Sequence, residues 1–322
     1  MEKKVTNLLI TFVPVTYLIA YVGALSLRWH QFQLLTRTLP HFADGLPTLF
    51  CIVTGLASIF AVFQVKNVLK LNAMTKKILD GKAPEDEDRN LAMHIYGRIR
   101  LIVTLENIIG FCIGNSMTAI LDISKGTVPF VPSRLCITVI EAICMGALVT
   151  FYEIYYFDLL FRPYRELLEI HKLQTKRVSH ISSKIMLVSF VCLFFMGLNT
   201  FTCGYGLLHR DNITSQTDVM KVYLQNGVIA IILNLVEYMV LIYIICREMK
   251  SRISDVTGVM QELEKSGDLS RRINISMTDD IGLLTHVQNE FMDKLAITIN
   301  GMKDHTQVVS SSADVLEPVC KL

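Results

Sequence analysis

Six long apolar runs alternate with shorter polar stretches along the first three quarters of the chain. The runs cover about residues 6–27, 46–65, 101–121, 135–160, 185–208 and 226–246. Each is long enough to cross the hydrocarbon core of a bilayer, which takes about 20 helical residues. Because lipid offers no hydrogen bonds, each run must satisfy its own backbone groups and is predicted to be a helix. The pattern therefore predicts an all-α membrane protein whose residues 1–246 form a six-span transmembrane region.

A different pattern follows the last apolar run. Apolar residues recur there at intervals of three and four, which predicts one apolar seam on each of two short amphipathic helices. The first seam consists of Ile253, Val256, Met260 and Leu263, and the second consists of Ile281, Leu284, Phe291 and Leu295. Gly267 and Leu269 fall in the non-helical connector between the two helices. Neither helix can bury its seam alone, so we expect a partner for them, most simply a second copy of the chain.

Three short motifs stand at fixed spacing within this segment. They are Gly267-Asp268-Leu269, Asp279-Asp280-Ile281-Gly282, and Asn289 together with Leu295. Their order and spacing resemble the HAMP linker, the dimeric relay that joins membrane spans to output domains in bacterial receptors. We therefore treat residues 247–296 as a HAMP-like linker domain. The alternative is an ordinary helical hairpin.

The resemblance also defines a relay core and some departures from the family. The core that it implies comprises Ile253, Val256, Met260, Leu263, Gly267, Leu269, Ile281, Gly282, Leu284, Phe291 and Leu295. Ile253 stands where the family usually has Pro, and Asp280 replaces the common Glu. Gln288 and Phe291 replace the usual Phe and Met of the second seam.

One heptad register continues from Ile281 almost to the end of the sequence. Twelve positions between 281 and 319 alternate by three and four, and eight of them are apolar. This periodicity is typical of a coiled coil. Residues 297–322 are therefore predicted to begin a cytoplasmic coiled coil that continues the second relay helix.

Composition agrees with a membrane protein and limits the partners. The chain of 322 residues is 52% hydrophobic with a formal net charge of +2, and its mean hydropathy is +0.43. Such a high apolar content is unusual for a soluble protein of this size. The nearly neutral charge argues against nucleic acid as a partner. The expected partners are the lipid bilayer and a second chain, in a homodimer or in a heterodimer with another receptor.

The basic residues predict the orientation in the membrane. With the N-terminus in the cytoplasm, the cytoplasmic pieces before the last span carry two Lys near the N-terminus, eight Lys/Arg between 66 and 100, and six between 161 and 184. The three outside loops together carry only six. By the positive-inside rule, the chain is expected in the inner membrane with both termini in the cytoplasm.

A few polar side chains stand inside the predicted spans, the most prominent being Glu106, Asn234 and Glu237. A carboxylate at the bilayer centre costs about 2.5–3.5 kcal/mol on insertion scales, so it should face the bundle interior. We hypothesise that Glu237, with Asn234 and Glu106, forms a polar site whose occupancy or protonation shifts the last span. The alternative is that these residues only form hydrogen bonds between helices.

No pattern in the sequence predicts catalysis, a metal site or a cofactor. A phosphate-binding loop, a nucleophile elbow and a His/Cys cluster at ligand spacing are all missing from the sequence. The 27 residues after Leu295 are too few for a kinase or cyclase domain. The chain is therefore not expected to be an enzyme, and downstream signalling proteins would be partners only if an output domain is present elsewhere.

The resemblance implies the input and relay part of a dimeric signal-transducing receptor. The layout is most similar to the N-terminal part of a methyl-accepting chemotaxis receptor without a periplasmic domain. Two alternatives stay open. One is the input region of a six-span, HAMP-containing cyclase, and the other is a membrane transporter or channel subunit.

Overall fold

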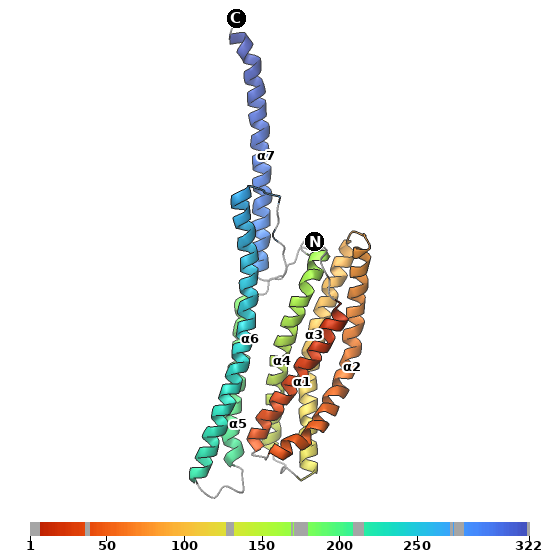
Figure 1. Cartoon of the computed structure of the whole chain (residues 1–322), viewed down its shortest axis with the longest axis vertical. Helices are drawn as coiled ribbons and strands as arrows, with labels where there is room; N and C mark the ends of the chain where they lie inside the picture. The colour runs from red at the N-terminus through yellow and green to blue at the C-terminus, as the bar shows by residue number, and fades with distance from the viewer. Residues whose placement is uncertain are drawn as a thin grey trace. The chain divides into compact units, whose positions relative to one another are not determined.

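The computed structural model describes residues 7–35, 39–126, 132–168, 170, 180–208, 216–270, 273 and 280–320. Over these residues the protein consists of helices alone, which confirms the predicted all-α class. There are seven of them in the described ranges: α1 (Leu8–Leu35), α2 (Leu39–Leu79), α3 (Asp86–Ser124), α4 (Pro132–Leu167), α5 (Ile181–Leu208), α6 (Gln216–Ser266) and α7 (Asp280–Cys320) (Figure 1).

The first six helices each contain a stretch that is long and apolar enough to cross a membrane. The predicted runs lie within these helices, except that the first run begins two residues before α1. The prediction of six helices that are long and apolar enough to span a membrane is therefore confirmed. Several helices continue well past their apolar run. Helix α2, for example, continues to Leu79 and ends just before Gly81, whose φ of 94° no ordinary helix residue adopts. Helix length therefore follows the position of helix-breaking residues and not the apolar run.

The chain divides into two compact units. The first comprises Met1–Leu173 with Ser182–Ile245, and the second comprises Gln174–Ile181 with Cys246–Leu322. The division falls inside α6, which is one continuous helix of 51 residues.

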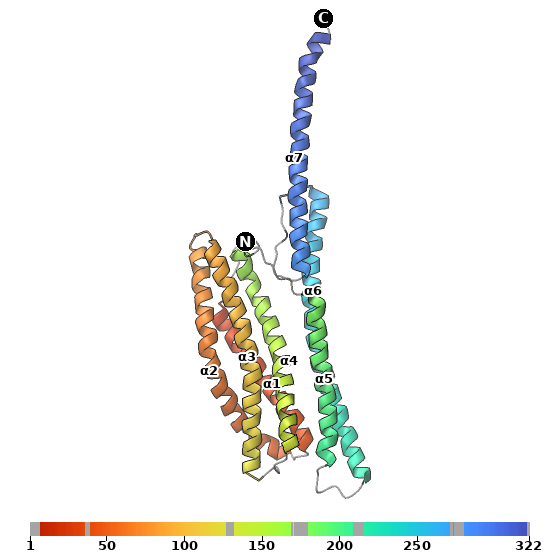
Figure 2. The ribbon, with the colours of Figure 1, turned by 180° about the vertical axis from the view of Figure 1, so that it is seen from behind.

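In the first unit, helices α1 to α4 pack side by side (Figure 2). An aromatic cluster joins three of them: Phe12 on α1, Tyr96 on α3, and Phe157 and Phe161 on α4. The ring centroids of Phe12 and Phe157 are 4.8 Å apart, and so are those of Tyr96 and Phe161. Phe12, Phe157 and Phe161 are almost completely buried. Aromatic contacts of this kind add to the packing that must hold helices together in lipid, where apolar burial between helices contributes little.

Glycine allows two of these helices to approach very closely. A Cβ atom on Gly146 of α4 would lie 2.8 Å from the backbone oxygen of Asn107 on α3. That oxygen belongs to a helix backbone and cannot move aside as a side-chain end could. Small residues at such contacts are typical of helix pairs in membranes. Gly146 therefore fixes the distance between α3 and α4.

Polar side chains connect α5 and α6 in the same unit. The Asn199 side-chain amide of α5 donates to Asn234 Oδ1 of α6 at 3.2 Å, and Ser189 Oγ lies 3.3 Å from the Tyr238 hydroxyl. Many large apolar residues on these helices point outward, among them Phe190 and Met239, which are 65% and 59% exposed. A lipid environment accounts for such exposure.

The second unit contains the end of α6, the connector and α7. Helix α6 ends before Gly267, which has a φ of 65° and donates its N–H to the Leu263 carbonyl oxygen at 2.8 Å. This is a common way to terminate a helix on glycine. Figures 1 and 2 show that α7 lies beside the end of α6 and runs in the same direction. An ordinary helical hairpin would place the two helices antiparallel.

Candidate functional site

Two of the three polar residues that were singled out in the sequence, Asn234 and Glu237, line one cavity of the first unit. The cavity has a volume of about 380 Å³ and lies between α1, α4, α5 and α6. Ser26 of α1 donates its hydroxyl to Glu237 Oε1 at 2.5 Å. The Tyr152 hydroxyl of α4 donates to the backbone oxygen of Glu237 at 2.6 Å. Glu237 therefore stands where three helices meet, with its carboxylate held by a single short hydroxyl side chain.

Glu106 lies in a different place. It lines a smaller cavity of about 60 Å³ between α1, α2 and α3. The side-chain amide of Gln64 on α2 donates to Glu106 Oε2 at 2.5 Å, and both residues are buried. The structure thus brings Asn234 and Glu237 together and places Glu106 apart from them.

A second carboxylate accompanies Glu106 in the interior of the bundle. The Asn107 side chain on α3 donates to Glu153 Oε2 on α4 at 2.9 Å, and Glu153 is only 2% exposed. Sequence reasoning missed Glu153, although its position inside the fourth apolar run was the same signal that identified the other intramembrane carboxylates.

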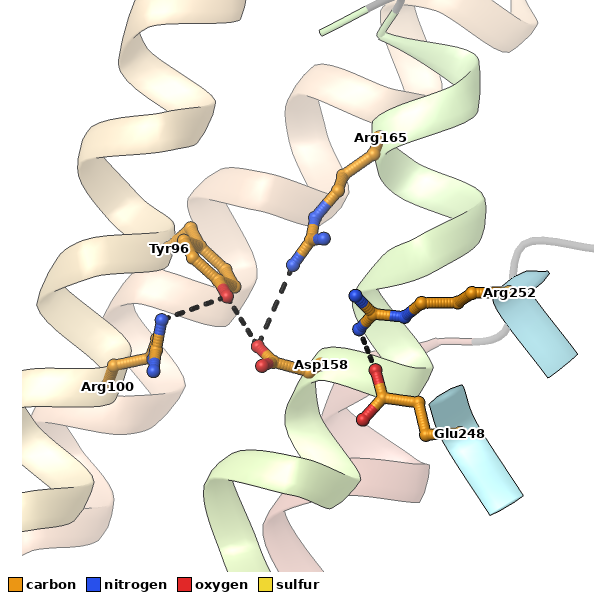
Figure 3. Close-up of polar contacts among 6 residues, drawn as sticks. All are labelled: Tyr96, Arg100, Asp158, Arg165, Glu248 and Arg252. Carbon is orange, nitrogen blue, oxygen red and sulfur yellow. Dashed lines mark hydrogen bonds and ion pairs between the residues drawn. The ribbon is translucent and has the colours of Figure 1, made fainter. Parts of the chain in front are cut away.

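Sequence reasoning also missed a charged cluster between α3 and α4, which Figure 3 shows. The Tyr96 hydroxyl donates to Asp158 Oδ1 at 2.5 Å, and the Arg100 guanidinium donates to the Tyr96 oxygen at 3.2 Å. Arg165 Nη2 lies 3.6 Å from the same Asp158 oxygen, and both side chains are less than 10% exposed. No local spacing predicts this cluster, because its members come from two helices and meet only when these pack.

The guanidinium of Arg165 also stacks on two aromatic rings. Its central carbon lies 4.8 Å from the ring centroid of Tyr96 and 5.2 Å from that of Phe161. Stacking on aromatic faces and pairing with Asp158 together compensate for removing this charge from water. These contacts hold α3 and α4 together, and we call the four residues Tyr96, Arg100, Asp158 and Arg165 the α3–α4 brace.

The first seam of the predicted relay lies on the end of α6. Val256, Met260 and Leu263 are half-buried, whereas Ile253 is 52% exposed. The Gln288 side chain of α7 donates to the sulfur of Met260 at 2.8 Å. Figure 3 also shows an ion pair between Glu248 and Arg252, one turn apart on α6.

The connector is held against α7 by Asn289. Its side-chain amide donates to the Ile273 carbonyl oxygen at 2.9 Å, and its Oδ1 accepts the Ile273 N–H at 3.0 Å. Ile273 itself is buried. Gly267 and Leu269 lie at the beginning of this connector, with Gly267 exposed and Leu269 half-buried. Asn289 is thus a positioning residue for the connector.

The residues of the predicted relay core on α7 differ in their exposure. Gly282 is buried and Ile281 and Leu295 are half-buried, whereas Leu284 and Phe291 are 55% and 52% exposed. The residues that α7 buries most completely within its own chain, Thr285 and Met292, lie on the neighbouring stripe of the helix. The stripe that carries Leu284 and Phe291 is left outward in the single chain.

Asp280, the residue that starts α7, also contacts His180 and Ile181, which belong to the same unit. Its Oδ2 accepts the backbone N–H of Ile181, and its Oδ1 lies 2.9 Å from His180 Nδ1. Ile181 is the first residue of α5. A carboxylate at a helix N-terminus satisfies an N–H that has no partner inside the helix and interacts favourably with the helix dipole.

None of these arrangements suggests a reaction. In the described part of the chain, no group of three or more His, Cys, Asp and Glu side chains is placed to hold a metal ion. Comparison of the chain with protein-family models, with curated proteins and with solved structures found no match. Two features are left that can carry a function. They are the pair of cavities lined by Glu106 and by Glu237, and the pairing of the end of α6 with α7.

Proposed function

We propose that this protein is the input and relay part of a chemotaxis-type receptor. In this proposal the six spans sit in the inner membrane with both termini in the cytoplasm, as the distribution of Lys and Arg predicts. The end of α6 and the beginning of α7 act as a HAMP-like relay, and the rest of α7 acts as a coiled coil.

The observation that carries the proposal is the parallel arrangement of α6 and α7. Helix α6 is continuous from the apolar stretch that carries Glu237 to the relay seam at Val256–Leu263. Helix α7 starts beside the end of α6 and runs in the same direction (Figures 1 and 2). In this arrangement a displacement of α6 along its axis moves the start of α7 through side-by-side contacts such as Gln288 with Met260. Parallel helices suit such a relay better than an antiparallel hairpin would.

The exposed stripe of α7 supports a second copy of the chain as the partner. Leu284, Phe291, Met302 and Val309 all belong to the predicted heptad seam, and each is between 52% and 67% exposed. Four such residues at heptad spacing form an unpartnered apolar stripe on one long helix. In the proposed dimer, two identical stripes in register, one from each copy, would bury each other.

The mechanism requires two packings of the relay that differ little in free energy. A signal in the membrane biases them only through a difference in its affinity for the two states. Glu237 is the group in α6 best placed to provide that difference, because it faces a cavity and belongs to the same helix as the relay. The output is a change in the packing of α7 against its partner.

Crosslinking tests the proposed dimer. In a background with the eight native cysteines replaced by alanine, single cysteines at Leu284, Phe291, Met302 and Val309 should form disulfides between copies in native membranes. A cysteine at Asn300, on the opposite side of α7, is the matched control and should not. Equal crosslinking at Asn300 and Met302, or none at the four seam positions, would reject the parallel seam.

A transporter is the second candidate, and the cavity at Glu237 is the observation that favours it. A cavity of about 380 Å³ with one carboxylate between four helices is also compatible with a substrate site. Uptake of a substrate into vesicles containing the purified protein would support the transporter. In the receptor proposal the same vesicles show no flux.

A further inference from the structure

The cavity at Glu237 has an apolar wall and one strongly polar point. Its lining includes Leu148 and Val149 from α4 and Phe195 from α5. Its lining residues with oxygen-bearing side chains are Ser26, Tyr152, Asn234, Glu237 and Tyr238, and the Tyr238 hydroxyl lies 3.3 Å from Ser189 Oγ. The side chain of Asn234 already makes two hydrogen bonds, accepting from Asn199 and donating to the Ala230 carbonyl oxygen. The hydroxyl of Tyr152 is committed to a backbone oxygen. The carboxylate of Glu237 is therefore the group with most capacity left for a ligand.

The described lining of the cavity provides no cation to balance this carboxylate. Among the described residues that line the cavity, none is Lys, Arg or His. Ser26 provides one hydrogen bond to Oε1, whereas a carboxylate can accept about four. Burying a carboxylate with so few partners is costly unless it is paired. A positively charged donor in the cavity would supply the missing partner.

The opening of the cavity indicates where a ligand comes from. Leu18 and Val22 on α1 and Val236 and Val240 on α6 line the cavity and are also between 46% and 62% exposed. These residues belong to the apolar stretches of the first and last spans. The entrance between α1 and α6 is thus apolar and faces the surroundings of the spans, which are hydrocarbon in a membrane.

We propose that this cavity binds a lipophilic amine that enters from the bilayer, with its ammonium group on Glu237 and its apolar body against α4 and α5. The volume of about 380 Å³ corresponds to roughly 15 non-hydrogen atoms, because a cavity of about 150 Å³ holds benzene. An anion is excluded by the carboxylate, and a purely apolar molecule leaves the carboxylate without a partner. As the stimulus of a receptor the amine rests on the proposed function, but the binding site itself depends only on the cavity.

The experiment uses 4-[4-(trifluoromethyl)phenyl]butylamine, which has the predicted size, and the corresponding alcohol as the neutral probe. Binding to the full chain in phosphatidylcholine nanodiscs is followed by fluorine NMR. Because a hydrogen bond to a charged group contributes about 1.5–3 kcal/mol, Glu237→Gln should weaken amine binding roughly tenfold or more. The alcohol should bind the wild type more weakly than the amine does, and Glu237→Gln should change alcohol binding by less than roughly threefold.

Two further variants separate the cavity from general effects. Val22→Phe places a larger side chain at the entrance and should abolish binding of both probes while Glu237 is intact. Glu106→Gln removes the carboxylate of the other cavity and should leave amine binding unchanged. Equal affinity of amine and alcohol, unchanged amine binding in Glu237→Gln, or equal loss in Glu106→Gln overturns the proposal.

The relay is tested separately from the site. Binding of the amine without any change in crosslinking along α7 supports the cavity and counts against the proposed signal path. A dimer with the predicted crosslinks but no amine binding counts against the cavity and leaves the relay proposal in place.

Discussion

Glu106 and Glu237 are both carboxylates in the apolar interior of a helix, yet their surroundings differ. Glu106 is buried, accepts a hydrogen bond from the buried amide of Gln64, and faces a cavity of about 60 Å³. Glu237 is half-buried, accepts one hydrogen bond among the described residues, from the Ser26 hydroxyl, and faces a cavity of about 380 Å³. Residue type and depth in a span therefore do not determine the role of a carboxylate. That role depends on its hydrogen-bond partners and on the size of the cavity that it faces.

Glu106 belongs to a set of carboxylates whose contacts join α2, α3 and α4. Glu153 pairs with Asn107, and Asp158 pairs with Tyr96 and Arg165. Glu237, by contrast, belongs to α6, which continues far into the second unit. Substitutions in the first set are therefore expected to reduce stability, whereas substitution of Glu237 should affect binding and signal more than folding.

The largest loss of stability is expected for Asp158→Ala. This substitution leaves Arg165, which is 5% exposed, without its carboxylate. Removing one partner of a buried ion pair costs about 3–5 kcal/mol. Unfolding by increasing SDS in mild detergent micelles measures the change. Asp86→Ala is the matched control, because that carboxylate is 81% exposed in its pair with Arg89 and should cost at most about 1 kcal/mol. Equal losses in the two variants would show that the α3–α4 brace does not stabilise the bundle.

The next largest effect is expected for Gly146→Ala. The added Cβ would lie 2.8 Å from the backbone oxygen of Asn107, so α3 and α4 must move apart. Overpacking of this kind costs about 1–3 kcal/mol. Gly227→Ala on α6 is the control, because a Cβ there meets no heavy atom of the described residues within 4 Å. The same SDS unfolding assay should show a loss for Gly146→Ala alone. A neutral or stabilising result for Gly146→Ala would mean that α3 and α4 can move apart around Asn107 without a loss of stability.

A smaller difference separates the two carboxylates themselves. Glu106→Ala leaves the Gln64 amide, which is 0% exposed, without its acceptor and should cost about 1–3 kcal/mol. Glu237→Ala should change the free energy of unfolding by less than about 1 kcal/mol, because the lost hydrogen bond is offset by removal of a poorly partnered carboxylate and the Ser26 hydroxyl can turn to a carbonyl oxygen of its own helix. The same unfolding assay compares the two. A larger loss for Glu237→Ala would reverse their assignment as structural and available carboxylates.

The helices were predictable from sequence because lipid imposes a simple requirement. Any long apolar run must satisfy its backbone internally, so the six runs predicted six of the seven helices in the described residues, and the heptad register predicted the seventh. The prediction of a separate short helix over Ile253–Leu263 was wrong, because α6 continues without a break to Ser266. Helix ends were less predictable. The apolar run that begins near residue 101 belongs to a helix that begins at Asp86, because polar residues such as Asp86–Asp88 are favourable in a first turn.

Partners between helices were not predictable, because they depend on the register in which two helices pack. Nothing near Tyr96 in the sequence indicates Asp158, and nothing near Glu106 indicates Gln64. The same reason explains the two faces of α7. The heptad pattern predicted one seam through Leu284 and Phe291, whereas the chain itself buries Thr285 and Met292 on the adjacent stripe.

In the proposed mechanism, a change at Glu237 alters the packing of α7 against α7 of a second copy. The measurement is the distance between spin labels on Lys303 of the two copies, by double electron–electron resonance in nanodiscs, for the wild type, Glu237→Gln and Glu106→Gln. The account predicts that Glu237→Gln shifts the distance by roughly 1–2 Å or changes the populations of two distances, and that Glu106→Gln matches the wild type. Identical distributions in the wild type and Glu237→Gln, or an equal shift in Glu106→Gln, would contradict it.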